Sequence, residues 1–162
     1  MSGPQDSLPR QGRIAGIDFG TVRIGVAITD PAQQLASPLD NYTRRSKDAD
    51  AAYFRKLAAE ERLAGFVVGL PVHTSGHESG KSHESRQFAQ WLAETTSLPV
   101  RLFDERYTSA HAEEALLAAG LTKKRRKARL DKLAAQIMLV AYLESSRREE
   151  PPGGIEDRRP PA

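Results

Sequence analysis

The chain has 162 residues, of which 39% are hydrophobic and 28% are charged. This size and composition fit one globular domain and exclude an intrinsically disordered protein. No apolar run approaches the ~20 residues of a transmembrane helix, and the polar first twelve residues lack the apolar stretch of a secretory signal. The lack of cysteine excludes disulfides, thiolate metal sites and cysteine nucleophiles. We therefore expect a cytoplasmic protein without a membrane partner.

Charge is concentrated in one segment of the chain. The 24 Lys and Arg residues exceed the 21 Asp and Glu residues by three, which only hints at a polyanionic partner. Residues 121–130, however, contain six cations and no acid, so the rest of the chain is mildly acidic. The sequence thus predicts an acidic body with a single basic segment.

The first elements are expected to be strands. Residues 13–19 and 22–29 are rich in β-branched side chains, and only Gly20–Thr21 separates them, a pair suited to a type II′ hairpin turn. A weaker third strand is expected at 35–42. Pro38 interrupts it and cannot donate a ladder hydrogen bond, so we expect this strand at an edge of the sheet.

The rest of the chain alternates between helical and strand patterns. Apolar residues near a 3.6-residue period predict amphipathic helices, and short apolar runs predict buried strands. In chain order we expect a helix at 47–63, a strand at 65–70, a Gly- and Ser-rich loop at 71–80, a helix at 81–96, a strand at 99–104, a helix capped by Thr108 that ends near Gly120, and a helix at 128–144. Trp91 and Phe88 lie at helical spacing and are expected to pack in the core.

These elements predict an α/β fold with a mixed five-stranded sheet. The first three strands are antiparallel, the later strands are parallel, and helices cover both faces. The domain is expected at residues 13–146, between flexible tails at 1–12 and 147–162. Ligands of such sheets bind outside the carboxyl ends of the parallel strands, so acidic residues at those ends are the first candidates for a site.

Two acidic residues occur where strands should end. Asp18 lies in the first strand, although strands disfavour Asp. Glu105 ends the last strand, with Asp104 on the opposite face. Each has an alternative explanation, since Asp18 could cap the Gly20–Thr21 turn and Glu105 could pair with a neighbouring arginine on the surface.

A third carboxylate, Asp131, precedes the uncharged segment 133–143, which predicts a buried helix. Asp131 is expected in the first turn of that helix, where the alternative is a favourable interaction with the helix dipole. If the three carboxylates converge, they suit hard divalent cations. Mg²⁺ prefers oxygen ligands, and two such ions can activate water and stabilise the leaving oxygen of a phosphodiester.

Four sequence motifs resemble one protein family. GIDFGTVRIGVAITD, VVGLP, DERYTSAHAE and LDKLAAQIMLVAYLE occur in this order across residues 13–143 and are similar to the YqgF family, also called RuvX. The resemblance implies a ribonuclease H-like fold and a Mg²⁺- or Mn²⁺-dependent nuclease with two ions, which matures the end of the pre-16S ribosomal RNA. It also implies metal ligands at Asp18 in IDFGT, Glu105 in DERYT and Asp131 in LDKLAA.

Residues beside these carboxylates and in the basic segment are candidates for substrate contact. They are Thr21, Arg106, Thr108, Lys123, Lys124, Arg125 and Arg126. Arg106 could equally pair with Asp104 or Glu105 and hold the shape of the site. A run of like charges also occurs as a solvated loop, but its position just before Asp131 favours contacts with phosphates.

Other functions remain open at the level of sequence. A Holliday-junction resolvase would act on DNA in recombination and would need a two-fold dimer with two sites. A non-catalytic nucleic-acid-binding module would assemble with a ribosomal subunit or transcription factors, and an ATP-binding module would bind nucleotide without cleaving RNA. Both a monomer and a homodimer fit the sequence, and a ribosomal RNA precursor is the favoured partner.

Overall fold

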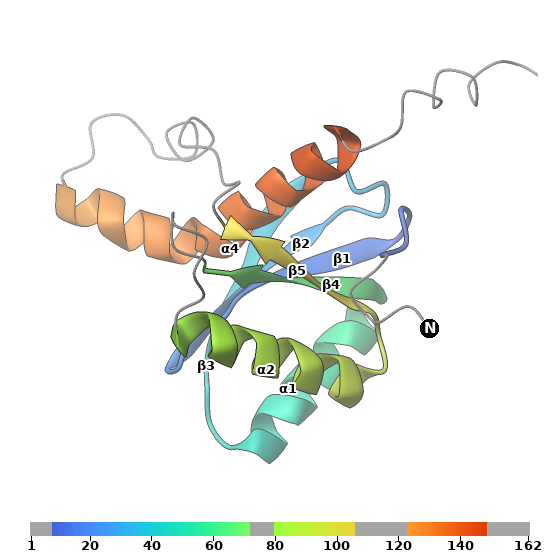
Figure 1. Cartoon of the computed structure of the whole chain (residues 1–162), viewed down its shortest axis with the longest axis horizontal. Coiled ribbons are helices and arrows are strands. Elements are labelled where there is room, and N and C mark those ends of the chain that lie inside the picture. The colour runs from blue at the N-terminus through green and yellow to red at the C-terminus, as the bar shows by residue number, and fades with distance from the viewer. Residues whose placement is uncertain (1–7, 72–79, 106–122, 149–162) are drawn as a thin grey trace, which may run out of the picture.

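A mixed sheet is the central layer of the protein in the computed structural model, which describes residues 8–71, 80–105 and 123–148 (Figure 1). Of the last segment, the side chains of residue 125 and residues 133–145 are described. The strands are β1 (Arg13–Asp18), β2 (Arg23–Thr29), β3 (Ala36–Thr43), β4 (Leu63–Leu70) and β5 (Val100–Asp104). They form a five-stranded sheet in the order β3-β2-β1-β4-β5.

Strand directions confirm the predicted mixed topology. β1 pairs antiparallel with β2, and β2 with β3, whereas β1–β4 and β4–β5 are parallel. β3 lies at one edge of the sheet, as Pro38 predicted. The carboxyl ends of β1, β4 and β5 therefore lie side by side along the edge of the sheet where these three strands end.

Helices cover both faces of this sheet. α1 (Lys47–Glu60) and α2 (Gly80–Thr96) lie on one face, and α4 (Lys123–Arg148) lies on the other (Figure 1). α1 ends three residues earlier than predicted because Arg62 adopts a positive φ of 50°, and β4 then begins at Leu63. The predicted helix after Thr108 lies outside the described residues. No described helix is long and apolar enough to cross a membrane.

Alternation along the strands divides the core between the two faces. On the side of α1 and α2, β1 contributes Ala15 and Ile17, which pack with Phe54 and Phe66. On the α4 side, Ile14 packs in a second cluster with helix residues that include Leu139. All of these side chains are essentially inaccessible to solvent. Full burial of such a side chain contributes ~1.5–3 kcal/mol, so both helical layers hold the sheet in place.

The turn between β1 and β2 differs from the predicted type II′ turn. Asp18 pairs with Gly25, and four residues connect the two strands instead of two. Gly20 does not adopt the positive φ that a type II′ turn requires. A Cβ atom at this position would instead collide with the carbonyl oxygen of Arg23. Close backbone approach, and not a left-handed conformation, is the structural reason for this glycine.

The last helix begins earlier than predicted. α4 already includes Lys123, five residues before the predicted start, because Lys and Arg favour helices and no glycine or proline separates them from the apolar segment. Asp131 consequently lies in the third turn of α4, where a dipole interaction at the helix N-terminus no longer explains it. α4 also continues to Arg148, two residues into the predicted tail.

The predicted N-terminal tail is partly held by the sheet. The side-chain amide of Gln33 donates to the carbonyls of Pro9 and Gly12 at 2.7 and 2.9 Å. The amide of Gly12 donates to the carbonyl of Pro31, and Leu8 packs against the α4-side core. Residues 8–12 therefore belong to the folded body, contrary to the expectation of a tail through residue 12.

Candidate active site

Two of the predicted carboxylates lie on the same face of the sheet. Asp18 ends β1, and Glu105 directly follows β5. On β5, Phe103 packs on the α4 side, so strand alternation places Glu105 on that side as well. Ile14 on β1 also packs on the α4 side, and Asp18 follows it by four residues. Both carboxylates thus lie at the edge where the parallel strands end.

Two glycines make room for these carboxylates. A Cβ atom at Gly69 on β4, the strand between β1 and β5, would overlap the carboxyl group of Glu105. A Cβ atom at Gly25 on β2 would lie 3.5 Å from the Cβ atoms of both Asp18 and Ala135. Gly25 on β2 and Gly69 on β4 therefore leave space above the sheet for Asp18 at the end of β1 and for Glu105, which follows β5.

The electrostatics of Glu105 reflect this crowding. Burial raises the pKa of the Glu105 carboxyl to about 7, the negative charges of Asp18 and Asp104 raise it as well, and Lys81 opposes the shift. Around neutral pH, the pocket therefore disfavours two ionised carboxylates in the metal-free protein. A bound cation would relieve this repulsion, so the pair of oxygen donors fits a hard divalent metal ion.

Helix α4 brings position 131 toward the same edge. Leu139 packs onto Gly16 of β1, and Ala135 lies over Gly25, opposite Asp18. From Leu139 back to Ala135, α4 therefore advances toward the carboxyl end of β1. Position 131 lies one helical turn before Ala135 on the same face of the helix, and so further in that direction. The Asp131 side chain is outside the described residues. Among the described side chains, no group of three His, Asp or Glu residues is placed to hold a metal ion.

The other predicted site residues are only partly described. Thr21 is exposed in the connection between β1 and β2, and Arg125 is exposed on α4. The side chains of Lys123, Lys124 and Arg126 are outside the described part, although their backbone is helical. Arg106 and Thr108 lie outside the described residues altogether. The basic segment is therefore an extension of the helix that carries Asp131, and not a loop.

Sequence reasoning missed two contributors to this site. Gly69 lies in β4, within the strand expected at 65–70, and directly beneath the Glu105 carboxyl. The signal was a glycine inside an apolar strand, which often marks a close approach of another group. Lys81, at the start of α2, was not singled out, and nothing in its local sequence connects it with Glu105.

Known proteins share both the sequence and the fold. A sequence model of the RuvX family, described as Holliday junction resolvase, matches residues 12–145. A protein of Rhodopirellula baltica named "Putative pre-16S rRNA nuclease" is 52% identical over 143 residues, which cover 88% of this chain and 83% of that protein. A protein of the same name from Rhodobacter capsulatus is 41% identical over 138 residues, 85% of this chain and 87% of the relative.

A solved structure shows the same architecture. The RuvC protein of T. thermophilus in complex with a Holliday junction substrate superposes with a TM-score of 0.53. It is 15% identical in sequence and covers 83% of this chain and 96% of its own. This likeness confirms the ribonuclease H-like fold. With the family model matched along residues 12–145 and two relatives aligned over most of their length, the chain belongs to the RuvX family.

Proposed function

We propose that this protein is a metal-dependent nuclease that hydrolyses phosphodiester bonds in the precursor of 16S ribosomal RNA. The observation that carries the proposal is the juxtaposition of Asp18 and Glu105 at the carboxyl edge of the sheet, where burial and mutual repulsion raise the pKa of Glu105 to about 7. An acidic pair this unfavourable for the metal-free fold is typical of a functional site. The names of the relatives supply the substrate.

The donor set suits Mg²⁺ or Mn²⁺. Asp18 and Glu105 would hold the metal, and Asp131 is the third proposed ligand because its position lies one turn beyond Ala135 on the same helical face. When bound, one or two such ions supply an activated water and neutralise the charge that develops on the phosphate. The proposed role of all three carboxylates is to bind the metal.

Basic side chains would orient the substrate. The segment that contains Lys123, Lys124, Arg125 and Arg126 lies on α4 about one to two turns before Asp131, so it can bind the phosphate backbone next to the site. Lys81, at the start of α2, interacts electrostatically with Glu105. Its ammonium group can contact a phosphate oxygen from the side opposite α4. Arg106, Thr108 and Thr21 are the further substrate contacts that we propose.

A second candidate is cleavage of four-way DNA junctions. The description of the family model and the likeness to the RuvC–junction complex are consistent with it. Such an enzyme needs two sites on a two-fold dimer, so it makes a distinct demand on oligomeric state.

A substrate panel separates these functions. Purified protein is incubated with a pre-16S RNA fragment, an unrelated single-stranded RNA and a synthetic four-way junction, each with Mg²⁺, Mn²⁺ or a chelator. The proposal predicts metal-dependent cleavage of the precursor fragment and none with the chelator. Cleavage of the junction alone would show that the protein is a junction resolvase and would contradict the proposed RNA substrate. The lack of cleavage of every substrate with either metal would contradict any nuclease function.

A further inference from the structure

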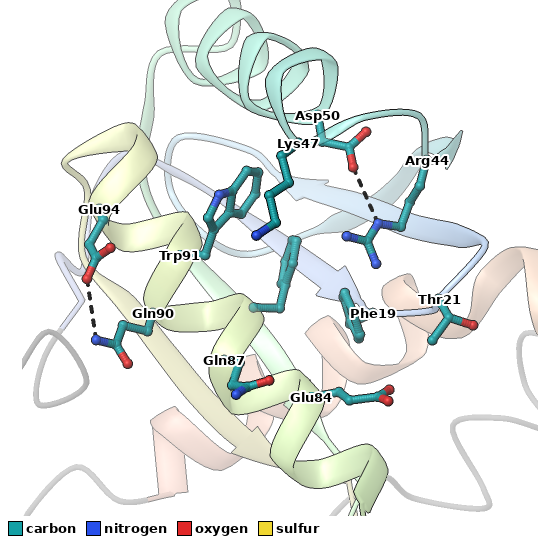
Figure 2. Close-up of a pocket in the computed structure, with 11 residues that line it drawn as sticks. Phe19, Thr21, Arg44, Lys47, Asp50, Glu84, Gln87, Gln90, Trp91 and Glu94 are labelled. Atoms are coloured by element: carbon teal, nitrogen blue, oxygen red, sulfur yellow. Dashed lines mark hydrogen bonds and ion pairs between the residues drawn. The ribbon is translucent and has the colours of Figure 1, made fainter.

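A groove of about 520 Å³ lies on the opposite face of the sheet from α4, between the first turn of α1 and the exposed side of α2 (Figure 2). Phe19, Phe88 and Trp91 form its apolar lining. Its volume is in the range of pockets that bind small organic molecules, ~300–1,000 Å³. The groove therefore has room for one nucleotide.

The three aromatic rings pack against one another. The ring centroid of Phe88 lies 4.7 Å from that of Phe19 and 5.5 Å from that of Trp91. Phe88 is buried beneath its neighbours, whereas Phe19 and Trp91 are only partly covered. Trp91 was expected to pack in the core, and it does contact the core, but it also lines the groove. Partly exposed rings of this kind can stack with a nucleobase.

Two cations lie above this aromatic surface. The Arg44 guanidinium lies 5.1 Å from the Phe19 ring centroid. Asp50 forms an ion pair with this guanidinium at 3.4 Å. Asp50 itself accepts hydrogen bonds from the Tyr42 hydroxyl at 2.6 Å and from the Arg45 amide at 3.0 Å. Lys47, on the first turn of α1, extends beside Trp91 (Figure 2). Cations next to stacking rings are the usual combination in single-strand binding sites.

The remaining polar lining is mixed in charge. Gln87 and Gln90 contribute amides, and Glu84 and Glu94 contribute exposed carboxylates. These carboxylates repel a continuous track of phosphates along the groove. Amide and carboxylate groups are, however, good partners for the edges of unpaired bases. The chemistry thus favours a base in the groove with its phosphate near Arg44 and Lys47.

The groove is connected to the proposed catalytic site. Phe19 directly follows Asp18 and points to the opposite side of the sheet. Phe19 and Thr21 line both this groove and a smaller one of about 330 Å³ that also contains Lys81. Lys81 in turn interacts with Glu105. A strand whose phosphate lies at the carboxylates can therefore pass Lys81 and Thr21 and reach Trp91.

We propose that this groove binds an unpaired nucleotide of the substrate, further along the strand from the scissile phosphate, by stacking its base on Trp91 and holding its phosphate at Arg44 and Lys47. The inference rests on the proposed function, and it specifies a single-stranded segment of RNA as the element that is recognised. Duplex RNA, whose bases are stacked and paired, does not fit the groove in this way.

Trp91 is the single tryptophan of the chain, so its fluorescence reports directly on the groove. The wild-type protein is titrated in a chelator, which prevents cleavage, with an eight-nucleotide single-stranded RNA, the same RNA as a duplex, and the corresponding single-stranded DNA. We expect saturable quenching by the single-stranded RNA and none by the duplex. Quenching by the DNA as well would also support a site that reads bases. RNA binding without any change in Trp91 fluorescence would overturn the inference.

Variants test the same contacts through the affinity for a labelled RNA. Trp91→Leu should weaken binding about 10-fold or more, whereas Trp91→Phe should retain most of the affinity because it keeps a stacking ring. Lys47→Gln should weaken binding several-fold. Lys56→Gln is the matched control, because Lys56 is exposed on the same helix outside the groove. Unchanged affinity in both Trp91→Leu and Lys47→Gln would overturn the inference.

The two proposals can fail separately. Saturable quenching in a protein that cleaves no substrate would leave the groove intact and reject the nuclease. Cleavage of the precursor by a protein whose Trp91 does not respond to RNA, and whose groove variants bind normally, would retain the nuclease and reject the groove.

Discussion

Glu105→Gln should stabilise the metal-free protein at alkaline pH, although it removes a proposed metal ligand. Burial and the charge of Asp18 raise the pKa of Glu105 from 4.5 to about 7, so ionisation is harder in the folded than in the unfolded chain. Below pH 4.5, the pKa of Glu105 in the unfolded chain, the carboxyl is neutral in both states and does not lower the free energy of unfolding. Part of that free energy is lost as the pH rises through about 7, the pKa in the folded protein.

The size of this effect follows from the pKa values. A rise from 4.5 to about 7 corresponds to at most ~3.4 kcal/mol of unfolding free energy at pH 8. Since the side chain is only partly buried and retains some solvation, we expect Glu105→Gln to gain ~1–2 kcal/mol at pH 8 and almost nothing at pH 4.

Urea unfolding in a chelator at the two pH values measures this gain. Glu144→Gln, on the exposed side of α4, is the control and should change stability little at either pH. Added Mn²⁺ should reverse the order, because the wild-type protein gains stability from metal binding and the variant gains less. A gain that is equal at both pH values, or a less stable variant at pH 8 without metal, would refute the reasoning.

Two further predictions concern the space above the sheet and the basic helix. Gly69→Ala places a methyl group where the Glu105 carboxyl lies, so metal-dependent cleavage should fall at least ~10-fold while the fold is kept; unchanged rates together with normal thermal unfolding would contradict this role of Gly69. Replacing Lys124, Arg125 and Arg126 together with Gln should lower the slope of log affinity against log salt for single-stranded RNA by up to ~2, and an identical slope would show that these side chains do not contact phosphates.

The sequence predicted the order and type of the described elements well, because apolar periodicity reflects burial. The uncharged segment 133–143 packs on the sheet as expected, and Leu139 there is fully buried. Where the signal was a repeating pattern over several residues, the prediction was confirmed.

Features that depend on neighbours distant in sequence were predicted poorly. The role of Gly69 depends on a side chain 36 positions later, and the groove at Trp91 depends on α1 and α2 lying side by side. No local pattern encodes such pairings. The start of α4 was missed because a charged run was taken as a loop boundary, although its residues favour helix.

The most direct test of the proposed active site is the rate at which the protein cleaves a pre-16S RNA fragment in Mn²⁺ before and after Asp18→Asn. This substitution keeps the size of the side chain and removes the negative charge next to Glu105. We predict that the variant folds normally by circular dichroism and cleaves at least ~1,000-fold more slowly, since the carboxylate pair would be broken. Wild-type cleavage rates in a folded Asp18→Asn protein would contradict the assignment of this edge of the sheet as the active site.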